Sequence, residues 1–465
     1  MTKDRTSEIP TTLSRQETEP VENSTIDNCS AEVRRKIARV MSVNDRGSSF
    51  RAYETDHTDN LHPGNNLTFL ISPTPFELPI AVKQRLGAYG ESISIFYQAC
   101  DSIFRELKDH HRWKNILTNN RPEWLLQKAK DEDDAISHIF LRPDFILTED
   151  GVVTAEIETS PFGLALALFL NEAYAEDSDK PNSQFVETFM TEVMGNDKSK
   201  SLCFMLTEHT KKYRGQFEYL AKLLMENGVN VLIAMPEDIE IKNQECFLNG
   251  MKIDVMYRMF YLHEAVQDES IAKILQQNLK VFPGYKSHLE EKAMMAMFFD
   301  DEFESIFRMI LGRHYDLLKD ILPPTYVLHE SPPSKLGISK WEELAKISRK
   351  ERRFVLKVSG FSDLGSWSKG VTFLNKLSQQ QCREVIQEAL AGETTFVIQE
   401  FKKGKNFQQE YYDFEKSNLA AMNGRVRFTP YFSARNGQML TAKTTMCANT
   451  DFIHAGTDSI NSPIQ

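Results

Sequence analysis

Cysteine pairs and long apolar runs are both missing from the sequence, and each absence excludes a class of protein. The six cysteines are scattered and form no Cys-x-x-Cys pair, which argues against a structural zinc site and against a disulfide framework. No apolar run approaches the roughly 20 residues that a helix needs to cross a bilayer. The polar start, residues 1–22, lacks the apolar core of a signal peptide. We therefore expect reduced thiols, no membrane contact and a cytoplasmic location.

A basic cluster is missing as well. The formal net charge is −11, and the lysines and arginines are not gathered into one region. A protein that binds nucleic acid usually carries a basic patch that attracts the phosphate backbone. We therefore expect no nucleic-acid partner.

What remains is the composition of an ordinary soluble protein. With 465 residues, of which 41% are hydrophobic and 26% are charged, the chain is too long for one small core, and two or three lobes are expected. Residues 1–60 are rich in Ser, Thr, Glu, Asp and Asn and show no sustained apolar period. This pattern predicts a disordered tail, with the globular part beginning at about residue 61.

Apolar periodicity predicts helices and strands in the globular part. Three- and four-residue spacing of apolar positions predicts helices at 93–107, 212–227, 286–320 and 382–390, and a continuous apolar run predicts a buried helix at 163–170. Shorter apolar runs predict strands at 202–206, 229–234, 253–258, 354–360 and 394–401, and a hairpin at 425–443. The order strand, helix, strand over 202–234 predicts a βαβ unit with parallel pairing.

A group of acidic side chains lies on a predicted hairpin that turns at Gly151. Arg142 and Asp144 stand two apart on its first strand, and Glu156 and Glu158 stand two apart on its second. Residues two apart on a strand share a face, so three carboxylates and a guanidinium converge if the two faces coincide. Three close carboxylates repel one another unless a cation lies among them, and oxygen ligands suit Mg²⁺. The alternative is a solvated hairpin face.

Lysines and a small flexible loop follow in the second half of the sequence. Lys357 lies in an apolar strand, where its charge is costly to bury unless an anion meets it. The loop at 359–370 holds three glycines and four serines, and such loops offer backbone N–H groups to phosphate oxygens. The loop matches neither the Walker pattern nor the Gly-x-Gly-x-x-Gly pattern. Lys292 starts an apolar helix, and Gln399 and Glu400 end a buried strand that could present them to a base.

Each of these features also has an ordinary structural explanation. Lys292 could be a helix-surface lysine, and a loop of glycine and serine could be a linker. Arg142 and Asp144 could be an exposed strand pair worth roughly 0–1 kcal/mol. Arg258 could hold an anionic substrate group or form a surface salt bridge, and for Arg427 and Lys443, on the strands of the last hairpin, a binding role and a structural one both stay open.

Taken together, these parts meet the needs of phosphoryl transfer. The chain resembles the ATP-grasp ligases, in which an Arg-x-Asp-Phe strand and a Glu-x-Asn strand hold Mg²⁺, and a Leu-Lys strand, a Gly/Ser loop and a hinge hold ATP. In that family the lysines come first and the metal strand comes last, whereas Asp144, Glu156 and Glu158 precede Lys292 and Lys357 in this sequence. That order is similar to the circularly permuted ATP-grasp proteins, among them the synthetase domain of glutathionylspermidine synthase. The resemblance covers the chain from about residue 65 to its end and rests on motifs.

The resemblance implies a fold, a division of the chain and a set of ligands. The implied fold class is α/β (α+β), an ATP-grasp-like fold in permuted order with a βαβ subdomain like the pre-ATP-grasp domain. The implied parts are a metal-binding half at 61–200, the βαβ subdomain at 201–285 and an ATP-binding half at 286–465. The implied ligands of Mg²⁺, with Mn²⁺ as an alternative, are Asp144, Glu156 and Glu158. The implied ATP-binding residues are Lys292, Lys357, Ser359, Gly360, Ser366, Ser368, Gly370, Gln399, Glu400 and Lys443. The implied catalytic cations are Arg142, Arg258 and Arg427.

The function that the resemblance implies is that of an ATP-dependent carboxylate–amine ligase, which forms an amide or peptide bond through an acyl phosphate. Its substrates would be a small acid and an amine, such as amino acids, short peptides or polyamines, and a homodimer stays open. Two departures from the family pattern are Glu158 in place of the usual Asn and Val358 in place of the usual Pro. They keep open the alternative of an ATP-binding regulatory protein with weak or no activity. A further alternative is a kinase on the same fold.

Overall fold

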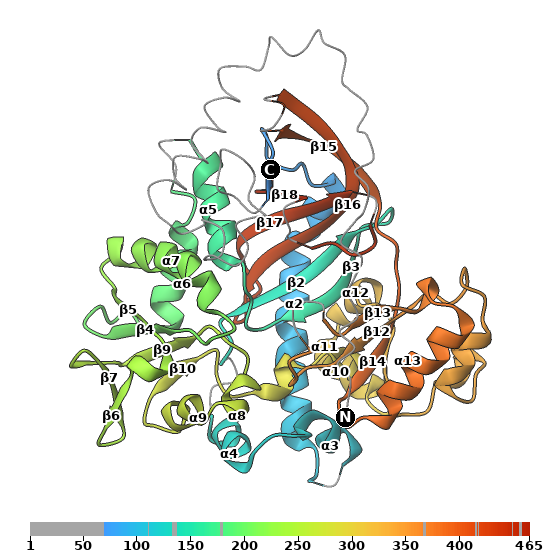
Figure 1. Cartoon of the computed structure of the whole chain (residues 1–465), viewed down its shortest axis with the longest axis horizontal. Coiled ribbons are helices and arrows are strands. Elements are labelled where there is room, and N and C mark those ends of the chain that lie inside the picture. Colours follow the sequence, from blue (N-terminus) through green and yellow to red (C-terminus); the bar gives the residue numbers. More distant parts are fainter. Residues whose placement is uncertain are drawn as a thin grey trace, which may run out of the picture.

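The computed structural model describes residues 69–465, apart from residues 110, 133–136, 177–179, 366–368, 414–415, 417, 449 and 455–457. The predicted tail at 1–60 lies outside the described residues, as do Ser366 and Ser368 of the predicted phosphate loop. The described chain is a mixed α/β protein with a large sheet, a parallel sheet, a small antiparallel sheet and a three-stranded ribbon (Figure 1). Among the helices described, none has the length and apolar character that spanning a membrane requires.

The large sheet combines strands from both ends of the described chain. Its order is β1 (Leu70–Ile71), β18 (Ser459–Ser462), β17 (Met439–Ala448), β16 (Asn418–Ser433), β2 (Phe140–Leu147) and β3 (Val152–Glu158), and β15 (Asn406–Asp413) also pairs with β16. The predicted hairpins are confirmed as β2–β3 and β16–β17. Because β2 pairs antiparallel with β16, the acidic hairpin from the first half of the sequence lies directly beside the last hairpin.

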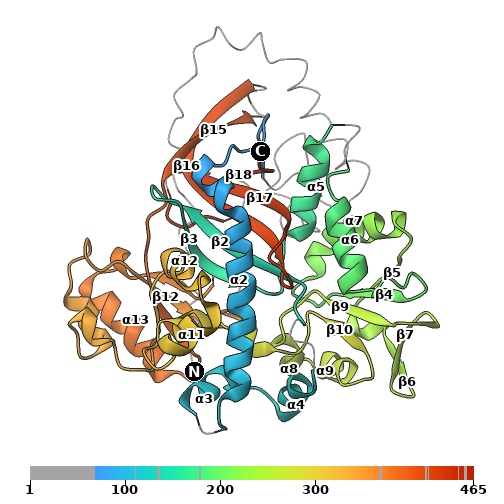
Figure 2. The ribbon, with the colours of Figure 1, turned by 180° about the vertical axis from the view of Figure 1, so that it is seen from behind.

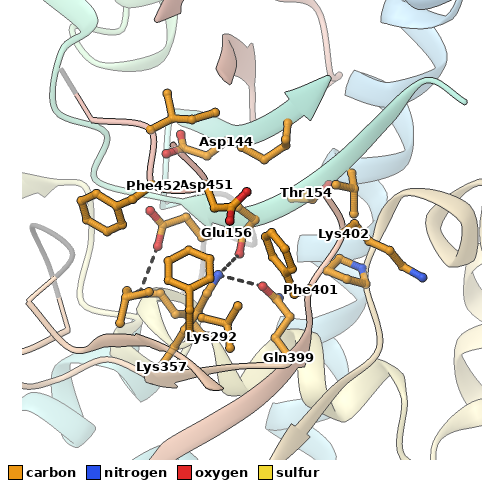
Figure 3. Close-up of a pocket in the computed structure, with 18 of the residues that line it drawn as sticks. Asp144, Thr154, Glu156, Lys292, Lys357, Gln399, Phe401, Lys402, Asp451 and Phe452 are labelled. Carbon is orange, nitrogen blue, oxygen red and sulfur yellow. Dashed lines mark hydrogen bonds and ion pairs between the residues drawn. The ribbon is translucent and has the colours of Figure 1, made fainter. Parts of the chain in front are cut away.

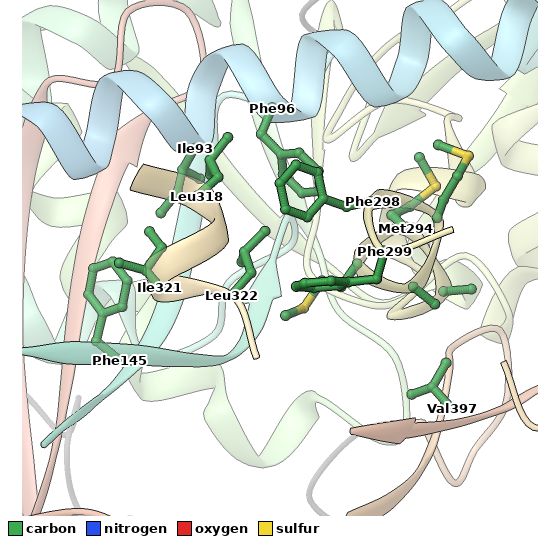
Figure 4. Close-up of a cluster of buried hydrophobic side chains, with 14 of the residues drawn as sticks. Ile93, Phe96, Phe145, Met294, Phe298, Phe299, Leu318, Ile321, Leu322 and Val397 are labelled. Carbon is green, nitrogen blue, oxygen red and sulfur yellow. The ribbon is translucent and has the colours of Figure 1, made fainter. Parts of the chain in front are cut away.

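A long helix, α2 (Ile80–Glu106), crosses the molecule on one side of the large sheet; it lies behind the sheet in Figure 1 and in front of it in Figure 2. The predicted helix at 93–107 is the second part of α2. The helix packs against β16, β17 and two shorter helices, α11 (Glu304–Leu311) and α12 (His314–Ile321). Its apolar face meets a core in which the rings of Phe96 and Phe298 lie edge to face, with their centroids 5.6 Å apart (Figure 4). The same core includes Phe145 of β2 and Val397 of the small sheet, so it joins the two sheets.

The parallel sheet is formed by the segment that follows the acidic hairpin. Its order is β10 (Lys280–Phe282), β9 (Val255–Arg258), β4 (Ser201–Met205) and β5 (Asn230–Ala234). The helix α7 (Arg214–Glu226) connects β4 to β5, and all pairs are parallel, so the βαβ prediction is confirmed. Gly228, with a φ of +86°, ends the turn after α7. The predicted buried helix is α5 (Leu164–Tyr174), which contacts both α7 and β17 and so ties this sheet to the large one.

The small sheet and its helices come from residues 293–400. Its order is β11 (Thr325–Val327), β14 (Phe396–Glu400), β12 (Phe354–Val358) and β13 (Val371–Phe373), and all its pairs are antiparallel. The predicted helix at 286–320 is wrong as one element, because α10 (Ala293–Phe298), α11 and α12 are separate helices. Gly312, with a φ of +51°, ends α11. The Asp300 carboxylate accepts the N–H of Glu302 at 2.9 Å and stabilises the break after α10.

The remaining elements connect these sheets. The other helices are α3 (Arg112–Thr118), α4 (Glu123–Asp131), α6 (Ser183–Glu192), α8 (Glu264–Gln267), α9 (Glu269–Leu275) and α13 (Gln379–Ala391), and the ribbon consists of β6 (Glu240–Lys242), β7 (Glu245–Leu248) and β8 (Met251–Lys252). The 3-10 turns are Lys211–Tyr213, Pro236–Asp238, Ser287–Glu290, Ser334–Leu336, Trp341–Lys346 and Leu374–Lys376.

Candidate active site

A cavity opens between the large sheet and the small sheet. It encloses about 1030 Å³ of space, part of which is open to solvent. Strands β2, β3 and β16 supply one wall, and β12, β13 and the end of β14 supply the other (Figure 3). The predicted site residues that line this cavity are Asp144, Glu156, Glu158, Lys292, Lys357, Gly370, Gln399, Glu400 and Arg427. The two sheets therefore bring together residues that lie up to 283 positions apart in the sequence.

A bulge in β3 shapes the acidic wall of the cavity. Between two regular pairs of the β2–β3 ladder, Ala155 and Glu156 together stand opposite the single residue Asp144. Such a bulge takes one residue out of the ladder and re-aims the side chains next to it. The Ala155 carbonyl accepts a hydrogen bond from Lys357 Nζ at 2.7 Å, and the Glu156 side chain lines the cavity. The bulge therefore presents a carboxylate and a carbonyl oxygen at the same place.

Two lysines reach this acidic strand from the opposite wall. Lys357 Nζ also donates to Gln399 Oε1 at 2.7 Å, and burial is the main cause that lowers the pKa of Lys357 to about 8. Lys292, the residue before α10, has its Nζ 3.3 Å from Glu156 Oε2 and donates to the Gly365 carbonyl at 2.9 Å. Both ammonium groups therefore lie close to β3. An anion with several negative charges that bound at this place would contact both of them.

Glu156 and Glu158 are buried carboxylates with opposite pKa shifts. Burial alone would raise the pKa of Glu156, but the charges of Lys292 and Lys357 outweigh burial and lower that pKa to about 2. For Glu158, burial and then the charge of Glu156 raise the pKa to about 7. Glu156 is therefore the carboxylate that its surroundings keep ionised, and a cation beside the pair would relieve the repulsion between the two groups.

Asp144 lies between two arginines. Arg142 Nε donates to Asp144 Oδ1 at 2.8 Å, and Arg427 Nη1 donates to Asp144 Oδ2 at 3.1 Å. Arg142 Nη1 also donates to the Phe162 carbonyl at 2.7 Å, and its Nη2 lies 3.9 Å from Glu158 Oε1. Arg427 Nε is buried and has no hydrogen-bond partner among the described residues. One carboxylate thus orients two guanidinium groups, and one of their N–H donors is left for an anion.

The surroundings of Asp144 differ from those of Glu156 and Glu158, the two other predicted metal ligands. Glu156 and Glu158 act on each other electrostatically, whereas both oxygens of Asp144 are held by arginines. In the part of the chain that the structure describes, no group of three or more His, Cys, Asp and Glu side chains is placed to hold a metal ion. Metal binding by Asp144 therefore stays a prediction.

Lys443 lies behind the arginines and does not line the cavity. Its Nζ donates to Thr445 Oγ1 and to Asn461 Oδ1, each at 2.9 Å. Burial first, and then the positive charges of Arg427 and Arg142, lower the pKa of Lys443 to about 7. Around Asp144 the large sheet thus carries the buried Lys443 and the half-buried Arg142 and Arg427, an excess of cationic groups that suits an anion site.

The burial of Lys443 predicts a pH-dependent cost in stability. An unfolded lysine titrates near pH 10.4, so the cost is absent above that pH, grows as the pH falls towards 7 and is constant below it. We expect Lys443→Met to gain stability relative to the wild type as the pH is lowered from 9.5 to 7, with a shift of about 2–4 °C in melting temperature. Thermal unfolding at both pH values measures it, and Lys346→Met at an exposed position is the control. An equal difference at both pH values would contradict the prediction.

The other end of the cavity is apolar and aromatic. The rings of Phe373 and Phe401 lie edge to face with their centroids 5.4 Å apart, and Phe452 faces Phe373 at 6.4 Å. Ile146 and Val153 of the large sheet line the same cavity. Aromatic and aliphatic walls of this kind suit a flat apolar ring system. They lie at the end of β14, where a base was predicted to bind.

The predicted hinge residues have different roles in the structure. The Gln399 amide is buried, and both of its ends are hydrogen-bonded. Its Nε2 donates to Thr325 Oγ1 at 3.1 Å, and its Oε1 accepts from Lys357 Nζ. Glu400 forms an ion pair with Lys402 at 3.3 Å near the cavity mouth. Gln399 therefore fixes the lysine, and the backbone beyond Glu400 is the part that faces the apolar end.

Several cavity residues were missed by the sequence reasoning. Arg425 stands two residues before Arg427 on β16 and shares its face, a signal that was present in the Arg-x-Arg spacing. Its Nη1 lies 2.6 Å from Oδ1 of Asp451, which sits in the last loop and shows no sequence signal. The sequence reasoning also missed the aromatic residues Phe373, Phe401 and Phe452, because a lone phenylalanine usually indicates a core position.

The remaining predicted residues lie outside the main cavity or at its rim. Arg258 is buried and lines neither this cavity nor the smaller one beside it; it donates to the carbonyls of Pro283, Phe260 and Gly284 and pairs with Glu290. Ser359 is fully buried and lines neither cavity. Gly370 does line the cavity, and a Cβ there would lie 2.5 Å from Val358 Cγ2 and 2.6 Å from the Leu364 carbonyl, so only glycine fits.

A smaller cavity adjoins the charged end of the main one. It encloses about 450 Å³ of partly open space and shares Glu156, Glu158 and Lys292 with the main cavity. Its other walls include Tyr261, whose hydroxyl donates to Glu158 Oε2 at 3.2 Å, and Gly360 of the predicted loop. The two spaces therefore meet at the acidic strand.

The chain matches no protein-family model and no curated protein. Solved structures resemble it in fold. One is a glutathione synthetase-like effector from Globodera pallida in its apo form, with a TM-score of 0.55 and 11% sequence identity over 93% of this chain and 96% of that chain. Another, described as a γ-glutamylcysteine synthetase from Methylobacillus flagellatus, covers 80% of this chain and 84% of its own, with 12% identity and a TM-score of 0.43, which is too low to argue from. The described chain has a mixed α/β fold with several sheets, and this fold is similar to that of a glutathione synthetase-like protein.

Proposed function

We propose that the chain is an ATP-dependent carboxylate–amine ligase with a circularly permuted ATP-grasp fold. The observation that carries the proposal is the meeting of Glu156 and Glu158 from one sheet with Lys292 and Lys357 from another in a single cavity. Phosphoryl transfer demands little covalent chemistry from a protein; it demands that charges be placed around the phosphates before the reaction begins. The cavity offers both signs of charge at one end and an apolar site at the other.

The order of the elements supports the permuted form. The acidic strand β3 comes first, the parallel sheet follows, and Lys292, Lys357 and the end of β14 come last. Strands β16 and β17 then return to the large sheet and lie beside β2. The large sheet is thereby completed by segments from both ends of the chain, as a permuted connection requires.

ATP fits the cavity with its base at the apolar end and its phosphates at the charged end. The base would lie near Phe373 and Phe401 and face the backbone beyond Glu400. The phosphates would replace the contacts that Lys292 and Lys357 now make with Glu156 and the Ala155 carbonyl. Glycine at position 370 lets the end of the loop pack directly against Val358 and the Leu364 carbonyl at the wall of the cavity.

Glu156 and Glu158 fit a divalent metal ion. Both offer oxygen donors, which Mg²⁺ and Mn²⁺ accept. Burial, and after it the charge of Glu156, raises the pKa of Glu158, and a cation beside the pair would favour the ionised form of both carboxyl groups. Such an ion would neutralise charge on the phosphate oxygens. For Asp144 we propose a different role: it positions Arg142 and Arg427.

In the proposed reaction, a carboxylate oxygen of the acid attacks the γ-phosphorus of ATP and ADP leaves. The nitrogen of the amine then attacks the acyl carbon, the C–O bond to phosphate breaks, and an amide is formed. The guanidinium groups of Arg142 and Arg427 would stabilise the negative charge that develops during both steps. The smaller cavity adjoins the acidic strand, so the acid and the amine would bind there, next to the phosphates.

The test is ADP release with a panel of amino acids, short peptides and polyamines. We expect ADP release that requires an acid, and a hydroxamate product when hydroxylamine replaces the amine, because hydroxylamine traps acyl phosphates. MgATP binding without turnover on any acid would favour a regulatory protein. A stable phosphorylated product that forms without an amine would favour a kinase.

A further inference from the structure

Glu291 carries a buried carboxylate whose two oxygens have different partners. Its Oε1 forms an ion pair with Arg121 Nη2, and its Oε2 accepts the hydroxyl hydrogen of Ser359. The side chains of Arg121 and Glu291 are each only 2% exposed. A buried ion pair is weak evidence for stability by itself, because desolvation offsets most of the attraction. What this ion pair does must therefore be inferred from the residues that it contacts.

The pair lies where the two phosphate lysines are anchored. Glu291 directly precedes Lys292, and Ser359 follows Lys357 by two residues. The Lys292 N–H donates to the Ser359 carbonyl at 2.9 Å, and the Ala293 N–H donates to Ser359 Oγ at 2.9 Å. The start of α10 and the end of β12 are thus joined through one serine, and Glu291 fixes the orientation of its hydroxyl.

The first residues of the loop after β12 pack onto the same place. A Cβ at Gly360 would lie 2.8 Å from the Glu290 carbonyl and 3.1 Å from Glu291 Cδ, so the backbone there is in direct contact. Phe361 has a φ of +44°, which is uncommon for any residue other than glycine. The Arg121 guanidinium lies 4.1 Å from the centroid of the Phe361 ring. Arg121 therefore holds both Glu291 and the residue with the unusual backbone.

Arg121 is itself fixed from outside the loop. It lies in the connection between α3 and α4, where its Nη1 donates to the Asn119 carbonyl at 2.6 Å and its Nε donates to Ser287 Oγ at 3.3 Å. The anchor is thus a chain of contacts that runs from this connection through Arg121 and Glu291 to Ser359. None of these three side chains lines the main cavity.

We propose that Arg121 and Glu291 are positioning residues for the phosphate end of the cavity. They hold the loop at 359–365 against the start of α10 and so set where Lys292 and Lys357 lie relative to each other. The role in nucleotide binding rests on the proposed function, whereas the anchoring of the loop does not. Ser359, which the sequence suggested as a phosphate ligand, is on this account part of the anchor.

The first experiment measures MgATP binding by isothermal titration calorimetry. Glu291→Gln keeps the shape of the side chain and removes its charge, and Ser359→Ala removes only the hydroxyl. We expect each variant to bind MgATP about 10-fold more weakly or worse, since a displacement of about 1 Å in a binding group costs up to about 10²-fold. The matched control is Asp254→Asn, which removes the charge of a half-buried carboxylate that accepts hydrogen bonds from the N–H and the hydroxyl of Ser201 in the parallel sheet. It should lower the melting temperature and leave MgATP affinity unchanged.

The second experiment needs no nucleotide. We expect hydrogen exchange of the backbone amides at 360–365 to become at least about 10-fold faster in Glu291→Gln and in Ser359→Ala, and to stay unchanged in Asp254→Asn. Slow exchange in both variants, with unchanged MgATP affinity, would overturn the proposal. If the wild type binds no MgATP, the proposed function fails, and faster exchange in the two variants would still support the anchor.

Discussion

Replacement of Lys357 by methionine is expected to lower the rate of ADP release by about 10²–10³-fold, the usual loss when one fixed electrostatic contact to a transition state is removed. The Lys357 ammonium is buried, donates to the Ala155 carbonyl and to Gln399, and faces Glu156 across the cavity. The protein should remain folded, because burial of this charge costs free energy in the wild type. Methionine has a similar length and no charge to bury.

The pH dependence of kcat/KM in the wild type is a second test of the role of Lys357. The pKa of Lys357 is lowered to about 8, and the positively charged form is the one that attracts phosphate. The pH profile of kcat/KM reports the ionisation of the free protein. We therefore expect kcat/KM for MgATP to fall as the pH rises through about 8, and this limb to be absent from the residual activity of Lys357→Met.

The control for Lys357→Met is Lys346→Met. Lys346 ends the 3-10 turn Trp341–Lys346 ahead of β12, is mostly exposed and pairs with Glu343 at the surface. The control should keep wild-type turnover and melting temperature. If Lys357→Met kept turnover within about threefold of the wild type while the control behaved as expected, the assignment of the phosphate end of the cavity would be wrong, because a lost phosphate contact costs far more.

The sequence was sufficient to place the acidic hairpin, the βαβ unit and the strand of Lys357, and the reason lies in local patterning. Alternation of apolar and polar residues indicates β2 and β3, and the same alternation places Glu156 and Glu158 on one face. The hydrophobic surroundings of Lys357 mark it as a residue whose charge needs a partner. These signals depend on neighbours within a few positions, which a single sequence displays.

What the sequence could not show depends on contacts between distant segments. The bulge at Ala155 and Glu156 depends on how β3 pairs with β2, and no turn residue marks it. Arg258 and Lys357 looked alike as cations on apolar strands, yet carbonyls 2 to 26 positions away enclose Arg258 while Lys357 faces the cavity. The ion pair of Arg121 and Glu291 joins residues 170 positions apart. Which cation is structural and which is free to bind is decided by this tertiary packing.

The second large effect is expected at Glu156, where replacement by glutamine should abolish Mg²⁺-dependent ADP release, with a loss of about 10³-fold or more. Glu156 is the charged member of the acidic pair, since its pKa is lowered to about 2, and it is the carboxylate nearest to Lys292. Its stabilising contribution is present above the pKa of an unfolded glutamate and is lost as the pH falls towards 2. Glu156→Gln should therefore also lower the melting temperature at pH 7, because Lys292 and Lys357 then repel each other without a carboxylate between them.

Glu158→Gln is the matched variant and should behave in the opposite way. Because the pKa of Glu158 is raised to about 7, this group contributes stability below the pKa of an unfolded glutamate, about 4.3, and that contribution is lost as the pH rises through 7. Glutamine in its place should make the protein more stable than the wild type at pH 8 and keep part of the turnover, since an amide oxygen can still bind a cation. Melting temperatures at pH 5 and pH 8, with ADP release at several Mg²⁺ concentrations, separate the two carboxylates. If Glu156→Gln and Glu158→Gln lost turnover and stability equally, the prediction would be wrong. The two carboxyl groups would then share their charge equally, and Glu156 would not be the ionised member beside a protonated Glu158.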